Sequence, residues 1–328
     1  MKKDEFPHHV VVIAEDVVLE DNIDSFNRKL EASSRKTLTE LEREIRMLGF
    51  DFIHYHKPIE LARNIDNHKM DLIFPAWNGE NSNSRVSIIP AICESANIRY
   101  IGADASTRSI CNDKELSKSI ARKLGFKVAK GIRIYTKDNL KLIENLDLPV
   151  IVKPCNEGSS IGINKESVCK TYDAIRFRIE LLWSKGFLHV YAEEFVIGRE
   201  ISICLMGNID GPKFENSVEI KISNAPNYLR TNPYDAKIKK GLFGKRRVHL
   251  LPSGFLDDDM KRAKAAFSYF GKINLFRIDG RLDEDNKFVF IEFATQPTFG
   301  KKSEIYAALS PHFSGYSDFI HSLLKLEI

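Results

Sequence analysis

Over the first hundred residues, short apolar runs alternate with longer amphipathic segments. An unbroken apolar run covers 10–14, and a segment with leucine and isoleucine at helical spacing follows and stops at Gly49. Three further apolar runs cover 52–55, 72–77 and 98–102, with polar or helix-compatible connectors between them. Strands that alternate with helices favour a parallel sheet covered on both faces. The pattern predicts an α/β domain over residues 1–108.

The pattern changes after residue 108. A helix capped by Asn112 or Asp113 is predicted to run to Gly125 and to lead into β-rich sequence. The strand 150–154 then enters a loop rich in glycine and serine, and a helix to Trp183 precedes another strand. We predict a central α+β subdomain over 109–196. A C-terminal α+β subdomain over 197–328 opens with strands and closes with helices.

Composition narrows the classes of protein. The chain has 328 residues, 43% of them hydrophobic, which argues against a fibre or a disordered chain. Lys and Arg number 49 against 45 Asp and Glu, so the net charge of +4 is too small for a dense nucleic-acid-binding face. No apolar run is long enough to span a bilayer, and five scattered cysteines without CxxC spacing indicate reduced thiols. We expect a cytoplasmic protein that binds neither nucleic acid nor membrane.

The segment 276–295 reads as a hairpin with its turn at residues 285–286. In that register, residues whose numbers sum to 571 face each other, so Asp279 lies opposite Glu292 and Arg277 opposite Ala294. Paired carboxylates repel each other unless a cation lies between them, and this spacing suits a magnesium ion that holds phosphate oxygens. An ordinary ion-pair cluster neutralised by Arg277 is an equally good interpretation of the segment alone. The opposite face, with Phe276, Ile278, Ile291 and Phe293, is predicted to supply the core.

Two further segments could bind a nucleotide. Lys153 ends a strand and precedes a Gly-Ser loop over 157–162, whose N–H and hydroxyl groups could cradle phosphates. The acids Glu193 and Glu200 flank a short apolar connector that could hold an adenine and its ribose. Taken one at a time, a surface turn and solvated acids are the simpler explanations. The basic stretch 237–247 is either a loop that closes over phosphates or a solvated loop.

Taken in order, these segments resemble the ATP-grasp superfamily, and within it the D-alanine–D-alanine ligase branch. The similarity covers nearly the whole chain and includes Tyr100-Ile101-Gly102 with Asn112-Asp113-Lys114, the Lys153 loop, the 193–200 hinge and the Arg277–Glu292 hairpin. It implies an ATP-grasp fold with an N-terminal parallel-sheet domain and two ATP-binding domains. It also implies ligation of a carboxylate to an amine through an acyl phosphate.

The resemblance assigns a role to each matching residue. ATP would be held by Lys114, Lys153, Glu157, Gly158, Ser160, Glu193, Val196 and Glu200. Mg²⁺ or Mn²⁺ would be held by Asp279 and Glu292. The catalytic set would comprise Arg277 on the oxyanion, Ser159 on substrate or phosphate, Lys237 on the γ-phosphate, and Glu20 on the substrate amine. Ser303 and Glu304 would face the acceptor substrate.

The sequence also departs from the family pattern. Ala294 stands in place of an asparagine metal ligand, Ile238 in place of a substrate-contacting tyrosine, and Glu304 in place of an apolar residue. An uncompensated Glu304 would repel the carboxylate of an acceptor such as D-alanine and favour a cationic acceptor, whereas a Glu304 that points to water would do neither. These departures favour a specialised biosynthetic ligase or cyclo-ligase for amino-acid-like substrates. A D-alanine–D-alanine ligase and a degenerate ATP-binding protein stay open as alternative functions. A homodimer stays open as the oligomeric state.

Overall fold

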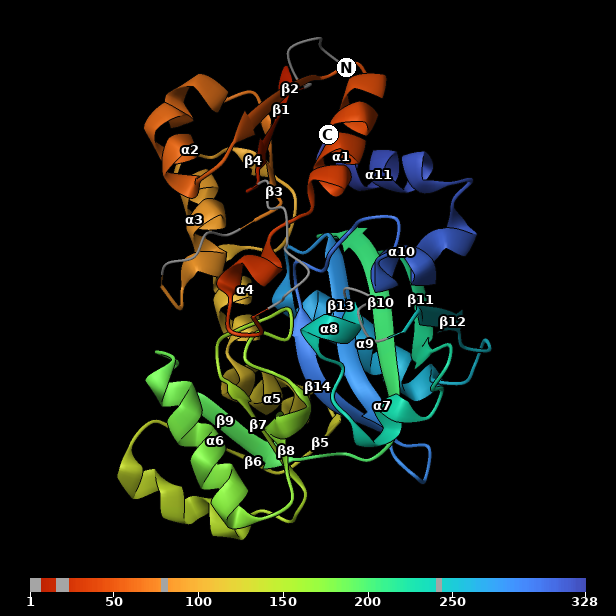
Figure 1. Ribbon diagram of the computed structural model, residues 1–328. Helices are drawn as coiled ribbons and strands as arrows, with labels where there is room; N and C mark the ends of the chain where they lie inside the picture. The colour runs from red at the N-terminus through yellow and green to blue at the C-terminus, as the bar shows by residue number, and fades with distance from the viewer. Residues whose placement is uncertain (1–6, 16–23, 78–81, 240–243) are drawn as a thin grey trace.

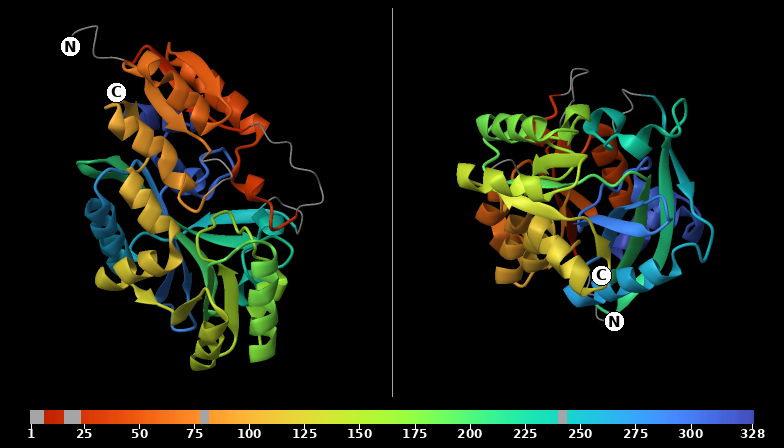
Figure 2. Two further views of the ribbon diagram at one scale, coloured as in Figure 1. Left: turned by 90° about the vertical axis from the view of Figure 1, so that its left-hand side faces the viewer. Right: turned by 90° about the horizontal axis from the view of Figure 1, so that it is seen from below.

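The computed structural model describes residues 7–15, 24–77, 82–239 and 244–328. Its strands form three sheets (Figure 1). The N-terminal sheet lies at one end of the molecule, and the other two sheets lie side by side at the opposite end (Figure 2). In the described residues, no helix has the length and apolar character needed to cross a membrane. All five cysteines are buried and free.

The N-terminal sheet is parallel throughout, as the alternating pattern predicted. Its strand order is β2-β1-β3-β4, with bounds β1 (His9–Ile13), β2 (Asp51–Tyr55), β3 (Leu72–Pro75) and β4 (Arg99–Tyr100). The predicted first helix is divided in two, because Ser34 caps a new helix by accepting a hydrogen bond from Thr37 N. The helical elements of this part are η2 (Arg28–Glu31), α1 (Arg35–Met47), α2 (Pro58–Asn64), η3 (Ile65–His68), η4 (Arg85–Ser87) and α3 (Ile88–Ser95).

The central sheet is antiparallel and has the strand order β6-β9-β7-β8. Its strands are β6 (Gly131–Ile134), β7 (Val150–Pro154), β8 (Val168–Cys169) and β9 (Val190–Glu194). The helical elements of this segment are α4 (Ala105–Asn112), α5 (Lys114–Lys123), η5 (Lys137–Asn145), η6 (Lys165–Ser167) and α6 (Tyr172–Ser184), of which α4 and α5 pack against the C-terminal sheet. Asp113 caps α5 by accepting hydrogen bonds from Glu115 N and Leu116 N, so the predicted cap is confirmed.

The C-terminal sheet has six strands in the order β12-β11-β10-β13-β14-β5. They are β5 (Lys127–Val128), β10 (Arg199–Asn208), β11 (Gly211–Ile222), β12 (Arg246–Leu250), β13 (Leu275–Leu282) and β14 (Phe288–Ala294). Its helical elements are α7 (Tyr228–Thr231), α8 (Ala236–Lys239), α9 (Asp257–Phe270), α10 (Glu304–Leu309), η7 (Ser310–His312) and α11 (Tyr316–Leu324). The short strand β5, which comes from the predicted central segment, pairs with β14.

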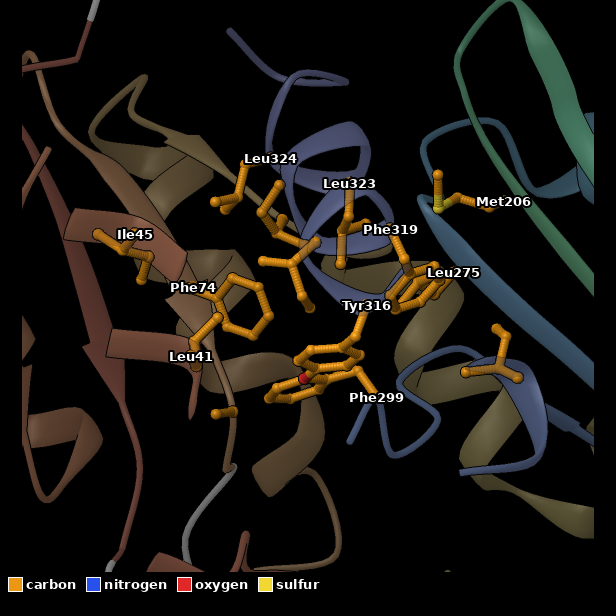
Figure 3. Close-up of a cluster of buried hydrophobic side chains, with 14 of the residues drawn as sticks. Leu41, Ile45, Phe74, Met206, Leu275, Phe299, Tyr316, Phe319, Leu323 and Leu324 are labelled. Atoms are coloured by element: carbon orange, nitrogen blue, oxygen red, sulfur yellow. The ribbon is translucent and has the colours of Figure 1, made fainter. Parts of the chain in front are cut away.

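The largest hydrophobic cluster joins the two ends of the chain. Helix α11 lies beside α1 (Figure 1), and its Phe319, Leu323 and Leu324 pack in one cluster with Leu41 and Ile45 of α1 (Figure 3). Met206 and Leu275 extend that cluster into the C-terminal sheet. The N-terminal sheet and the C-terminal sheet therefore share one apolar core.

Candidate active site

A cavity opens between the central and C-terminal sheets and encloses about 780 Å³, counted to its open mouth. All of the residues predicted to hold ATP or the metal line it: Lys114, Lys153, Glu157, Gly158, Ser160, Glu193, Val196, Glu200, Asp279 and Glu292. Residues far apart in the sequence therefore meet at one site.

Two lysines hold the carboxylate of Glu193 at the cavity wall. Lys153 Nζ lies 2.5 Å from one oxygen and Lys118 Nζ lies 2.7 Å from the other. All three side chains are buried. Burial alone would raise the pKa of Glu193, but the charges of Lys118 and Lys153 outweigh burial and hold the pKa at about 2. Glu193 is therefore ionised, and its remaining lone pairs can still accept a hydrogen bond from an adenine amine.

The Gly-Ser loop has an uncommon backbone conformation. Ser159 and Ser160 have φ values of +50° and +61°, a left-handed region that non-glycine residues seldom occupy. Gly158 and Ser160 line the cavity, whereas Ser159 does not. Ser160 Oγ donates a 2.8 Å hydrogen bond to the carbonyl of Tyr234, which connects the loop to the C-terminal sheet side.

A cluster of four charged residues fastens this loop to the N-terminal part of the chain. Glu157 accepts hydrogen bonds from Arg28 at 3.0 Å and from Arg85 at 2.7 Å, and Arg85 also reaches Glu31 at 2.8 Å. Glu31 in turn accepts a hydrogen bond from Gly158 N at 3.1 Å. We call Arg28, Glu31, Arg85 and Glu157 the clasp. The side chain of Glu157 is thus engaged by protein groups of the clasp. The backbone carbonyl of Glu157 accepts a hydrogen bond from Lys114 Nζ.

The predicted carboxylate pair is present in the sheet. Asp279 lies directly opposite Glu292 between β13 and β14. Arg277 binds both oxygens of Asp279 at 2.8 Å, and Ser202 donates to Asp279 Oδ1 at 2.6 Å. No described residue donates a hydrogen bond to Glu292, whose closest ion-pair partner is Lys114 Nζ at 3.9 Å. With respect to the described residues, Glu292 therefore has free acceptor oxygens.

Oxygen donors of this kind suit Mg²⁺. The charges of Lys114, Lys153 and Lys239 outweigh burial and lower the pKa of Glu292, so this carboxylate is ionised as a metal ligand requires. Among the described residues, no group of three or more His, Cys, Asp and Glu side chains could hold a metal ion. A cation between Asp279 and Glu292 would therefore need phosphate or water oxygens to complete its coordination.

The predicted hairpin register is confirmed at the Asp279–Glu292 pair and is wrong between that pair and the turn. Asp279 pairs with Glu292, but Gly280 pairs with Phe290, so a bulge leaves Ile291 without a direct partner. The bulge moves Ile291 out of the predicted core face and into the cavity lining. Phe290 takes its place in the core beside Phe293, with ring centroids 4.4 Å apart.

Arg281 holds the 193–200 hinge at one end of the cavity. It was not predicted from the sequence as a site residue. Its guanidinium donates to the Glu200 carboxylate at 2.9 Å and to the carbonyls of Val196 and Leu229 at 2.8 and 2.6 Å. Burial raises the pKa of Glu200, although Arg281 opposes that shift. Arg281 lies on the same strand face as Arg277 and Asp279, so side-chain alternation contained a signal for it.

Glu304 does not point to water, and its charge is compensated. Its carboxylate accepts hydrogen bonds from Tyr234 Oη at 2.6 Å, from Arg246, and from Arg277 at 3.3 Å. Burial would raise the pKa of Glu304, but Arg277 and Arg246 outweigh it and hold the pKa at about 2. The compensation comes from these two arginines. Ser303 caps α10 by accepting a hydrogen bond from Tyr306 N.

The remaining predicted residues that the structure describes lie outside the cavity lining. Lys237 is exposed, and Lys239 lines the cavity instead. Ile238 is buried in a small core with Ile220 and Leu229. Arg277, Ser159, Ser303 and Glu304 are not lining residues, and Glu20 lies outside the described residues.

Comparison with known proteins places the chain in a family. The family profile "D-ala D-ala ligase C-terminus" matches residues 126–325. The chain is 30% identical over 279 residues to the D-alanine–D-alanine ligase of Pelagibacter ubique, covering 82% of this chain and 85% of that enzyme. It is 28% identical to D-alanine–D-alanine ligase A of Salmonella typhimurium, over 84% of this chain and 74% of that one.

Solved structures show the same fold. The D-alanine–D-alanine ligase of Bacillus anthracis complexed with ATP superposes with a TM-score of 0.74 at 17% identity, over 98% of this chain and 97% of that one. The VanG D-Ala:D-Ser ligase of Enterococcus faecalis gives 0.72 at 20% identity, over 98% and 100%. The chain thus belongs to the D-alanine–D-alanine ligase family of the ATP-grasp superfamily, and it is an ATP-dependent ligase that forms a carbon–nitrogen bond.

Proposed function

We propose that this protein is a D-alanine–D-alanine ligase. The observation that carries the proposal is the single cavity in which the predicted ATP-binding and metal-binding residues meet. The chain is also 30% identical, over most of both chains, to a protein named D-alanine–D-alanine ligase, and this supports D-alanine as the substrate. In the proposed reaction, one D-alanine carboxylate takes the γ-phosphoryl group of ATP and ADP leaves. The amine of a second D-alanine then displaces phosphate and releases a proton.

The residues of the cavity suit each part of that reaction. Lys114 and Lys153 supply positive charge for phosphate oxygens, and the backbone N–H of Ser160 would be a further donor, because the N–H of Gly158 already binds Glu31. The hinge from Glu193 to Glu200 offers an apolar wall and two carboxylates to the adenine and ribose. A magnesium ion on Asp279 and Glu292 would neutralise phosphate oxygens. Arg277 would stabilise the oxyanion that forms when the amine attacks.

Two of the three departures that favoured a specialised ligase, at Glu304 and Ile238, have structural explanations. Glu304 cannot repel an acceptor carboxylate as a free charge would, because Arg246 and Arg277 compensate it. Both of its oxygens are engaged, so it offers little to a cationic substrate. Ile238 belongs to the core, and Tyr234, four residues earlier, presents a tyrosine to the cavity. At these two positions the site therefore offers no reason to prefer another substrate to D-alanine, which supports the proposal.

The test is a ligation assay with purified protein, ATP, Mg²⁺ and D-alanine. We expect ADP release together with D-alanyl-D-alanine detected by mass spectrometry. A parallel panel contains L-alanine, D-serine, and basic, amidine and amino-oxy amino acids. Turnover with a panel member but not with D-alanine would refute the substrate assignment and restore the specialised-ligase hypothesis. ATP binding without turnover of any substrate would favour the degenerate ATP-binding protein.

A further inference from the structure

Glu304 is a buried carboxylate to which the proposed reaction gives no task. It begins α10 and is only 4% exposed. Oε1 accepts hydrogen bonds from Tyr234 and Arg246, and Oε2 accepts one from Arg277. A buried charge with three donors around it is held in one orientation. Glu304 is therefore placed to fix its partners.

One partner is Arg277, which two carboxylates hold from opposite sides. Asp279 binds Nε and Nη2, and Glu304 binds Nη1. Under the proposed function the two carboxylates differ, because Asp279 must also give an oxygen to the cation. Asp279 Oδ1 already accepts hydrogen bonds from Ser202 and Arg277, so its capacity is limited. Glu304 is then a second carboxylate that helps to keep Arg277 in place, through one hydrogen bond of 3.3 Å.

The other partner is the segment that covers the cavity. Pro233, Tyr234 and Lys239 line the cavity, and we call residues 233–239 the covering segment. Tyr234 binds Glu304 through its hydroxyl and Ser160 of the phosphate loop through its carbonyl. Arg246 adds a hydrogen bond to the same hydroxyl at 2.7 Å. Glu304 thus connects Arg277 to the covering segment directly.

We propose that Glu304 is a positioning residue that fixes the Arg277 guanidinium and fastens Tyr234 over the cavity. This role rests on the proposed function of the site. It differs from the substrate contact that the resemblance implied, because the oxygens of Glu304 are engaged by protein groups. Loss of its charge should therefore lower the rate of the chemical step more than it weakens the binding of ATP or D-alanine.

The test compares Glu304→Gln with Tyr234→Phe and with a surface control. The glutamine keeps the shape and can still accept a bond from Tyr234, but it has no charge for the arginines. We expect kcat to fall by roughly tenfold, less than the roughly 100-fold of losing an oxyanion donor because Asp279 still holds Arg277, with small changes in KM for ATP and D-alanine. The control, Glu144→Gln, breaks an exposed ion pair with Arg176 and should leave kcat unchanged.

Tyr234→Phe tests the connection to the covering segment. Trypsin cleavage after the exposed Lys237, measured with a non-hydrolysable ATP analogue and Mg²⁺, should become roughly tenfold faster, as expected for losing one hydrogen bond to a charged group. Thermal melting of each variant checks that the fold persists. This assay stands in for Glu304→Gln if that variant is unstable.

Each arm has an outcome that overturns the proposal. Wild-type kcat in Glu304→Gln, or a change confined to KM for D-alanine, would assign Glu304 to the substrate or to no role. Unchanged cleavage in Tyr234→Phe would remove the connection to the covering segment. If the wild-type protein ligates another amino acid and not D-alanine, the proposed function fails. The kcat comparison with that substrate and the trypsin assay then still decide the role of Glu304.

Discussion

Replacing Lys118 by methionine removes a buried cation and keeps most of its apolar volume. Lys118 is fully buried in α5, and its ammonium lies 2.7 Å from Glu193 and over the rings of Tyr191 and Phe290. Methionine can keep the ring contacts. The substitution therefore isolates the loss of charge opposite Glu193.

The size of the effect follows from the ion-pair geometry. At 2.7 Å and an effective dielectric constant of about 20, the attraction between the two charges is about 6 kcal/mol. The cost of burying the ammonium offsets part of this value, and breaking a buried pair usually costs about 3–5 kcal/mol. Because Lys153 still holds the other oxygen of Glu193, we expect the lower end, about 3 kcal/mol.

Urea unfolding at pH 7 measures this loss for Lys118→Met, Glu193→Gln and the double variant. The double variant should lose about 2 kcal/mol less free energy of unfolding than the sum of the losses of the two single variants. In the double variant, neither Lys118 nor Glu193 remains as a buried charge without the other. Lys123→Met is a matched control: Lys123 is an exposed lysine of α5 that also lies over an aromatic ring. It should change the free energy of unfolding by no more than about 0.5 kcal/mol.

Two results would contradict the expected contribution of the Lys118–Glu193 ion pair. A loss below about 1 kcal/mol in Lys118→Met would mean that the ion pair contributes little beyond its burial cost. Strict additivity in the double variant would mean that Lys118 and Glu193 do not interact in solution. ATP affinity provides a separate check, because Lys118 does not line the cavity. Lys118→Met should therefore weaken nucleotide binding less than Lys153→Met.

Three further predictions concern the hairpin and the buried carboxylates. Asp279→Asn or Glu292→Gln should abolish ligation with unchanged circular dichroism, because an amide keeps the shape but not the charge for Mg²⁺; full activity in both would disprove the metal site. Arg277→Lys should lower turnover roughly 100-fold or more with little change in ATP affinity by calorimetry, and the reverse pattern would reassign Arg277 to the nucleotide. Glu193 and Glu304 have folded pKa values of about 2, below the ordinary 4.5, so their stabilisation is present above pH 4.5 and lost as the pH falls toward 2. Each should contribute on the order of 3 kcal/mol, measured as a shallower pH dependence of unfolding in the Glu→Gln variants.

The sequence predicted the parts of the site that depend on local pattern. Side-chain alternation with a short turn placed Asp279 opposite Glu292, and the Gly-Ser loop after Lys153 indicated a phosphate site. Lys118 follows Lys114 by one helical turn, so helix periodicity contained a signal that sequence analysis did not use. Arg281 could have been found by alternation from Asp279.

Other features depend on tertiary contacts that no local pattern encodes. The bulge at Ile291 depends on how β14 fits between β13 and β5, and a symmetric hairpin rule cannot contain it. The contact of Ser202 with Asp279 needs the register between β10 and β13. The compensation of Glu304 by Arg246 joins residues 58 positions apart. Without that contact, Glu304 reads as either a solvated acid or a free charge.

The clasp determines where this chain can be divided or recombined. A cassette that began near residue 109 would contain Glu157 and the phosphate loop but would lack Arg28, Glu31 and Arg85. The Glu157 carboxylate would lose both of its arginine partners, and the N–H of Gly158 would lose its acceptor. If the nucleotide-binding half is exchanged between related enzymes, residues 28–31 and Arg85 must therefore be taken from the same enzyme as the phosphate loop. In this chain the N-terminal region supplies side chains that hold the phosphate loop. The two regions are therefore expected to be exchanged between relatives only together.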